Sequence, residues 1–251
     1  MEKRILETLE RIEWERDVEI LYACESGSRA WGFASPDSDY DVRFIYAGNL
    51  DRYLTVERVR DVIELPIVDE LDVNGWDVKK ALGLMRSSNP TLLEWLHSPV
   101  VYRANERFVA SMRTLAAEAM RPRTLCHHYL SMAWKDWRNN IERGRATPKR
   151  YLYTLRTLLC ARWVIEHGAI PPVAFDELIK ATVDSEPLWN EINELLLLKA
   201  NSNEKARMLR NPVFDRYIAE AFAELEARLP DSNAKLPPEP FNELLVKTVG
   251  V

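Results

Sequence analysis

Runs of apolar residues divide the chain into a mixed region and a helical region. In the first region, "DVEILYAC" (17–24) is a nearly continuous apolar run, which favours a buried strand, and "YDVRFIYA" (40–47) alternates as a second strand does. "RDVIELP" (60–66) and "DELDVNGWD" (69–77) predict one or two more strands. The first seventeen residues are charged throughout and have the spacing of an amphipathic helix, with Ile5, Leu9 and Ile12 facing inward.

From Arg107 onward the apolar spacing is that of amphipathic helices only. Gly144 and Gly168 are expected to end two of these helices, and a proline-rich linker precedes a last short helix. We therefore predict an α+β fold, in which a small mixed sheet flanked by helices occupies 1–110 and an all-helical domain occupies 111–251.

Composition places the chain among soluble globular proteins. Apolar residues make up 47% of its 251 residues and charged residues 29%. No run approaches the roughly 20 apolar residues that span a bilayer. The three cysteines are odd in number and widely spaced, which fits a reduced chain better than a disulfide framework. We expect a cytoplasmic protein that does not associate with membranes; its oligomeric state is left open.

The net charge of −5 is unevenly distributed. Between Arg121 and Arg162 there are ten Lys and Arg residues against Asp136 and Glu142, so this stretch carries +8 and the remainder −13. A stretch this basic could face phosphates, or it could neutralise the acidic part of the same chain.

The segment "CESGSRAWGFASPDSDYDVRF" (24–44) contains a candidate phosphate site. Gly27 and Ser28 directly follow the first strand and begin a short helix, which Gly32 is expected to end. Backbone N–H groups at such a helix start point outward, and glycine lets a phosphate approach closely.

Two carboxylates follow on the next strand. Residues two apart in a strand share a face, so Asp39 and Asp41 are expected to point the same way, with Arg43 beside them. Adjacent carboxylates repel each other, and a divalent cation such as Mg²⁺ would remove that cost. Alone, the loop could be a surface turn and Arg43 an ion-pair partner of the aspartates. A phosphate turn and paired carboxylates together predict a nucleotide–metal site.

These residues resemble the signature of the DNA-polymerase-beta-type nucleotidyltransferases. "ACESGSRAWGF", "GWDVKKAL", "SSNPTLLEWLHSP" and "KRYLYTLRTLL" resemble one branch, predicted nucleotidyltransferases linked by name to RNA repair, across most of 18–175. The resemblance implies a catalytic domain over 1–110, Mg²⁺ or Mn²⁺, and transfer of a nucleoside monophosphate from an NTP, with ATP expected. It also implies that Gly27 and Ser28 hold the triphosphate and that Asp39 and Asp41 hold the metals.

The superfamily places a third acidic residue on a neighbouring strand. Asp72, between Leu71 and Val73, has the flanks of a strand residue and is the expected third catalytic and metal-binding carboxylate. The alternative, Asp77, stands before "VKKAL" and has the position of a helix N-cap. Arg43 could neutralise phosphate charge.

In the helical region, Lys149, Tyr153 and Arg156 are spaced to share one helix face. They could meet a triphosphate and stack on a base, or they could form a solvated basic face. The resemblance favours nucleotide binding, because helical second domains in this superfamily often close over the nucleotide. Cys126, His127 and His128 are not expected to bind zinc, because adjacent helical histidines point about 100° apart and no second ligand pair follows.

The sequence therefore predicts a metal-dependent nucleotidyltransferase. The acceptor hydroxyl is left open between an RNA end, a protein hydroxyl and a small alcohol such as an aminoglycoside. A non-catalytic nucleotide sensor is the competing class. A sensor could lose Asp41 or the third acid, whereas this chain keeps Asp39, Asp41 and a candidate third, which favours catalysis.

Overall fold

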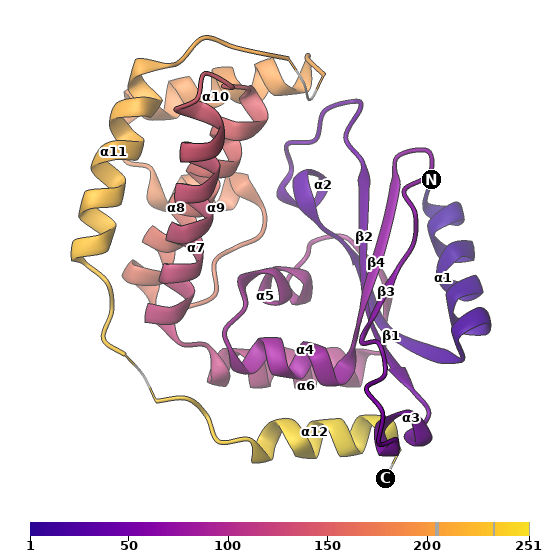
Figure 1. Cartoon of the computed structure of the whole chain (residues 1–251). Helices are drawn as coiled ribbons and strands as arrows, with labels where there is room; N and C mark the ends of the chain where they lie inside the picture. The colour runs from indigo at the N-terminus through magenta and orange to yellow at the C-terminus, as the bar shows by residue number, and fades with distance from the viewer. Residues whose placement is uncertain (204–205, 233, 251) are drawn as a thin grey trace. The chain divides into compact units, whose positions relative to one another are not determined.

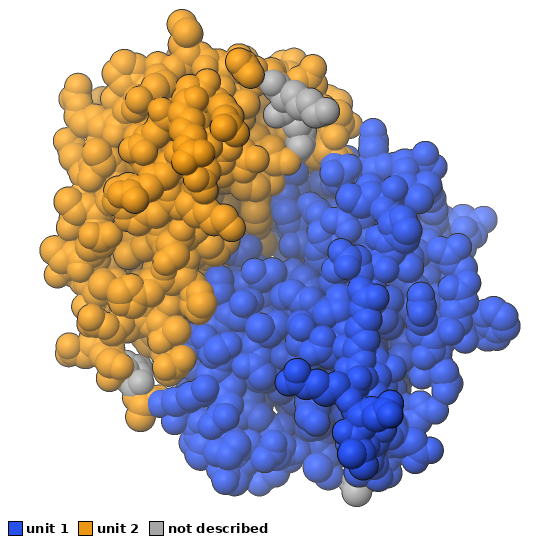
Figure 2. Space-filling model, viewed as in Figure 1, with its two compact units in different colours: residues 1–30, 39–120, 235–251 blue, residues 31–38, 121–234 orange. Residues whose placement is uncertain are grey.

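The fold is described from a computed structural model, which describes all residues except 204–205, 233 and 251. The chain forms two compact units (Figure 2). Unit 1 comprises 1–30, 39–120 and 235–251, and unit 2 comprises 31–38 and 121–234.

Unit 1 is built on a mixed β-sheet (Figure 1). The sheet has five strands in the order β3-β4-β2-β1-β5. The central strand, β2, is parallel to its neighbour β4, and the other neighbours are antiparallel. The strands are β1 (Val18–Glu25), β2 (Tyr40–Gly48), β3 (Val62–Glu64), β4 (Leu71–Asp77) and β5 (Val101–Ala104). The helices of unit 1 are α1 (Glu2–Arg16), α2 (Gly27–Trp31, whose last residue belongs to unit 2), α3 (Leu50–Leu54), α4 (Val78–Arg86), α5 (Pro90–Leu96), α6 (Glu106–Ala119) and α12 (Glu239–Val249).

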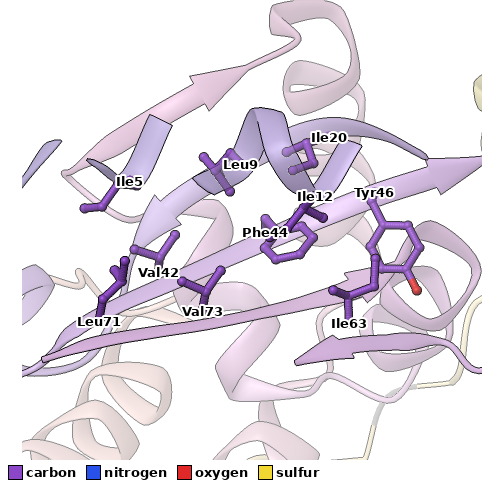
Figure 3. Packing of buried hydrophobic residues seen from close by; sticks show 11 residues of the cluster. Ile5, Leu9, Ile12, Ile20, Val42, Phe44, Tyr46, Ile63, Leu71 and Val73 are labelled. Atoms are coloured by element: carbon purple, nitrogen blue, oxygen red, sulfur yellow. The ribbon is translucent and has the colours of Figure 1, made fainter. Parts of the chain in front are cut away.

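One face of the sheet is covered by α1. Ile5, Leu9 and Ile12 point from this helix toward the strands, as their spacing predicted (Figure 3). Val42 and Val73 belong to the same buried cluster. Because side chains alternate along a strand, the residues next to these valines point to the opposite face. The side chains under α1 are therefore apolar. On the opposite face, β2 carries polar residues at its start and the buried apolar residues Ile45 and Ala47 farther along.

Unit 2 is helical. It contains α7 (Pro122–Asp136), a π-helical turn (Trp137–Ile141), α8 (Pro148–His167), α9 (Phe175–Thr182), α10 (Glu186–Ala200) and α11 (Pro212–Ala227). Gly168 ends α8 in a left-handed conformation with φ 60°, which confirms it as a stop signal. Gly144, also at positive φ, follows the π-helical turn rather than a continuous α-helix.

The α+β prediction is correct, but the two units differ from the ranges 1–110 and 111–251. α6 extends unit 1 to Met120, the segment 31–38 belongs to unit 2, and 235–251 returns to unit 1, where α12 packs against α4 and α6. The strand β5 was also missed: it has only four residues, and its pairing with β1 forms it. Among the described residues, no helix is both long and apolar enough to cross a membrane.

Candidate active site

Asp41 and Asp72 lie side by side on the face of the sheet opposite α1. They are directly opposite each other in the parallel register of β2 and β4. Their neighbours Val42 and Val73 fill the core under α1, so alternation turns both aspartates to the other face. The structure thus places the second carboxylate of the motif next to the expected third.

Arg43 bridges these two carboxylates. Its Nη2 donates to Asp41 Oδ1 and to Asp72 Oδ2, both at 2.7 Å. Its Nη1 also donates to the Asp72 carbonyl oxygen at 3.0 Å. The three side chains are only 17–26% exposed. Arg43 therefore forms an ion pair with Asp41, as one of the two interpretations of its position predicted. Its second partner is Asp72, and not Asp39.

The Gly27 turn lies against the same carboxylate. Gly27 has φ +61°, and a Cβ added there would be 2.1 Å from Asp41 Oδ2. A backbone hydrogen bond from the Ser26 N–H to the Asp41 carbonyl, 2.9 Å, fixes this approach. Ser28, the next residue of the turn, is buried. The two halves of the motif, the Gly27 turn and the carboxylate, thus meet at Asp41.

Glu25 is a buried residue of this site that the sequence reasoning missed. Its carboxylate accepts hydrogen bonds from the Asp41 backbone N–H at 2.7 Å and from the Tyr102 hydroxyl. Burial raises its pKa, although both hydrogen bonds oppose the shift. Glu25 therefore holds the start of β2 in place. Its position at the end of an apolar strand, immediately before the Gly-Ser turn, is the signal that could have revealed it.

Asp39 is placed differently from Asp41. It precedes β2, which begins at Tyr40, and it is exposed. Its carbonyl oxygen accepts from Arg29 Nε at 3.1 Å, and the Arg29 guanidinium lies 3.7 Å from the centre of the Tyr40 ring. The strand-face argument therefore does not apply to Asp39, because this residue lies in the turn and not in the strand.

Asp77 has the structural role expected of a helix N-cap. Its Oδ1 accepts from the Lys79 backbone N–H at 2.8 Å and its Oδ2 from the Tyr53 hydroxyl at 3.1 Å. Burial raises the pKa of Asp77, although both hydrogen bonds act to lower it. In register it lies opposite Tyr46, five residues along β4 from Asp72. The geometry thus favours Asp72 as the third carboxylate.

The loop that leads to Asp39 is anchored inside unit 2. Ser35 and Ser38 are buried, and their hydroxyl oxygens are 3.0 Å apart. The fully buried Lys199 donates from Nζ to Ser35 Oγ at 2.6 Å. The loop is therefore not a bare surface turn. The sequence reasoning missed Lys199, which continues the buried stripe of α10 formed by Leu188, Ile192 and Leu195. A lysine at such an apolar position indicates a buried polar contact, and this pattern could have revealed it.

Lys149, Tyr153 and Arg156 lie on α8 within unit 2. Lys149 Nζ is 5.5 Å from the centre of the Tyr153 ring, and this ring packs edge-on against Trp31 at 5.0 Å. The Arg156 guanidinium lies 4.3 Å from the Trp31 ring, and Arg156 is 1% exposed. The three residues thus share one aromatic cluster. A solvated basic face is excluded for Arg156.

The Asp41 and Asp72 pair fits a single cation. One oxygen of each carboxylate contacts the same charged nitrogen of Arg43. Mg²⁺ is usually held by one or two carboxylates together with substrate phosphates rather than by an all-protein cage. Within the part of the chain that the structure describes, no group of three or more His, Cys, Asp or Glu side chains is arranged to hold a metal ion, so Asp39, Asp41 and Asp72 are not brought together as one three-carboxylate set.

Comparison with known proteins gives matches over nearly the whole chain. The chain is 41% identical over 256 residues to the uncharacterized protein YcgL of Bacillus subtilis (strain 168), covering 99% of this chain and 96% of the relative. A crystal structure of a nucleotidyltransferase-like protein from Exiguobacterium sibiricum 255-15 matches with 15% identity and a TM-score of 0.32, covering 97% of this chain and 79% of that one. This structural likeness is too low to carry an argument.

The family evidence comes from a match over residues 1–247 to the model described as RlaP, RNA repair pathway DNA polymerase beta family. This match covers both units and includes the Gly27 turn and all three aspartates of the motif. The resemblance seen in the sequence is thereby confirmed, and the chain belongs to the RNA repair pathway DNA polymerase beta family.

Proposed function

We propose that this protein is a metal-dependent nucleotidyltransferase that transfers a nucleoside monophosphate from an NTP, with ATP expected, to the hydroxyl of an RNA end. The observation that carries the proposal is the meeting of Asp41, Asp72 and the Gly27 turn at one point of the sheet. Family membership supports the reaction class, and the family description supports RNA as the acceptor.

Each residue of the site has a chemical task in this proposal. The Gly27 and Ser28 backbone would bind the triphosphate, since a glycine-led helix start accepts a phosphate without a side chain in the way. Asp41 and Asp72 would hold Mg²⁺ or Mn²⁺; Asp39, in the adjoining turn, is the further metal-binding carboxylate that the family resemblance implies. When bound, the metal neutralises phosphate charge and lowers the pKa of the acceptor hydroxyl.

The reaction is an in-line displacement at the α-phosphorus. The acceptor oxygen bonds to the α-phosphorus, the bond from that phosphorus to the α–β bridging oxygen breaks, and pyrophosphate leaves. Asp72 would take the hydroxyl proton as general base. Glu25 would keep the Asp41 backbone in register through the 2.7 Å hydrogen bond, so that the carboxylate stays beside Gly27.

The basic stretch of unit 2 gives weak support to an RNA acceptor. It carries +8 between residues 121 and 162. If its lysines and arginines contact RNA phosphates, the affinity for RNA should fall steeply as the salt concentration rises. Lys149, Tyr153 and Arg156 would contribute to nucleotide binding through their cations and the Tyr153 ring.

The test is incubation of the purified protein with each α-labelled NTP, Mg²⁺ or Mn²⁺, and short RNAs. The Asp39→Ala/Asp41→Ala variant is the control for the site. Label on RNA with the native protein alone would support the whole proposal and identify the nucleotide. Label on protein or on a small alcohol would keep the transfer reaction and replace the acceptor. Metal-dependent NTP binding without label on any acceptor would favour a nucleotide sensor.

A further inference from the structure

Unit 2 contains a cavity of its own, about 350 Å³ in volume. It is formed by the end of α7, the π-helical turn, the first half of α8 and Trp31, all within unit 2. Ligand pockets for small molecules begin at about 300 Å³. Single π-helical turns are frequent at functional sites, and here the turn that follows α7 provides part of the wall.

An aromatic and cationic surface forms one side of the cavity. Trp31 and Tyr153 are packed edge to face with 79° between their rings, and Arg156 lies over Trp31 at 4.3 Å. Both rings line the cavity and are only partly buried. A planar ligand can therefore stack on aromatic carbon beside a positive charge.

The other side of the cavity is polar. Asp136 accepts hydrogen bonds from Arg150 at 2.7 Å and from the Asn140 amide at 2.9 Å. Asn139 and Lys135 line the same side and are exposed. Amide and carboxylate groups can read the donors and acceptors on the edge of a nucleobase. Arginine and lysine bind phosphate through charge-assisted hydrogen bonds.

The charges of the lining define the ligand further. Lys135, Arg150 and Arg156 face one acidic residue, Asp136, so the lining carries +2. A ligand that complements this cavity is planar at one end and anionic at the other. We infer that the cavity at the π-helical turn of unit 2 binds a nucleotide, through its base and one phosphate group. The choice of a nucleotide among planar anionic ligands rests on the nucleotidyltransferase function proposed above.

The experiment measures nucleotide binding with the catalytic carboxylates removed. The Asp41→Ala chain is titrated calorimetrically in EDTA with ATP, with a five-nucleotide RNA and with inorganic triphosphate. We expect saturable binding of at least one of the two probes that contain a base, ATP or the RNA. Inorganic triphosphate should bind at least tenfold more weakly than that probe. Equal affinity for triphosphate and ATP would overturn the inference, because the site would then read phosphate alone.

A matched pair of variants locates the binding. Lys135 lines the cavity, whereas Arg138 is an exposed cation three residues away that stacks on Trp134 at 4.6 Å. In the Asp41→Ala background, Lys135→Ala should weaken binding about tenfold, as the loss of one charge-assisted hydrogen bond predicts. Arg138→Ala should leave the affinity within about twofold. Equal weakening by both variants would mean general electrostatic attraction and would contradict the inference.

A third variant tests the contribution of the base. Asn139→Ala removes an exposed amide that carries no charge, so it should weaken ATP binding and leave triphosphate binding unchanged. The outcome is separable from that of the proposed function. Binding that depends on Lys135 in a protein that transfers no label would keep the cavity and reject the transferase. Label transfer by a protein whose nucleotide binding does not depend on Lys135 would keep the transferase and reject the cavity as a nucleotide site.

Discussion

Removing the positive charge of Arg43 tests whether Asp41 and Asp72 form a cation site. Arg43→Gln removes the guanidinium that bridges the two carboxylates, whose negative charges then face each other. Their oxygens lie 2.7 Å from the same nitrogen, hence within about 5 Å of one another. At an effective dielectric constant of about 20, two unit charges at about 5 Å repel by about 3 kcal/mol.

The expected loss of stability is somewhat smaller than this figure. The aspartates are about a quarter exposed, so water and side-chain movement relieve part of the repulsion. We expect the free energy of unfolding to fall by about 1–3 kcal/mol, or roughly 2–4 °C in Tm for each kcal/mol in a chain of this size. Arg60→Gln is the matched control. It makes the same charge change at an exposed pair, 3.6 Å from Glu64, and should cost less than about 0.5 kcal/mol.

The decisive measurement is thermal unfolding by circular dichroism with EDTA and with increasing Mg²⁺. Because a divalent cation can replace the lost guanidinium, Mg²⁺ should raise the Tm of Arg43→Gln more than that of the native protein. Mn²⁺ binding followed by electron paramagnetic resonance should be tighter in the variant, since the Arg43 guanidinium no longer competes. Arg43→Lys keeps the charge and should stay near the native values. A destabilised Arg43→Gln whose Tm and Mn²⁺ affinity do not respond would refute a cation site at this pair.

Three further changes test the surroundings of the site. Gly27→Ala should lower the free energy of unfolding by at least about 1 kcal/mol, because it combines a left-handed φ with a steric clash; transfer activity equal to that of the native protein would contradict this view of the turn. Because burial raises the pKa of Glu25, the folded state keeps the proton of this carboxyl to a higher pH than the unfolded chain does. Stability should therefore fall as the pH rises from 4.5 through the folded pKa, and Glu25→Gln should flatten that fall in urea titrations between about pH 4 and 7. Lys199→Met, which frees the loop at Ser35, should reduce transfer about tenfold or more while the helical circular dichroism is kept; the exposed Lys180→Met is its control, and equal activity in the two would rule out an anchoring role.

Local patterns in the sequence were enough to predict much of unit 1. The apolar run of β1, the alternation of β2 and the stripe of α1 each depend on neighbours a few residues apart. The N-cap at Asp77 and the stop at Gly168 are local in the same sense, and both are confirmed. The strand β5 was missed because its four residues have no pattern of their own.

The rest depends on contacts between distant parts of the chain. Ser35 is held by a lysine 164 residues away, and Glu25 is linked to Tyr102 across 77 residues. Arg43 could be placed near the carboxylates from its strand position, but its partner Asp72 follows from the parallel pairing of β2 and β4. The return of 235–251 to unit 1 likewise follows from the packing of α12 on α4 and α6. This packing cannot be predicted from the local sequence of the segment.

The division of the chain into units has a consequence for how this protein can be taken apart. The polypeptide passes between the units at 30/31, 38/39, 120/121 and 234/235. The eight residues at 31–38 belong to unit 2, yet Gly27 precedes them and Asp39 follows them. A gene fragment that ends at residue 120 would encode the sheet but would strip this segment of its packing partners, Lys199 among them. Recombination can therefore transfer the segment from Gly27 to Asp41 intact only together with the helices of unit 2 that pack against 31–38.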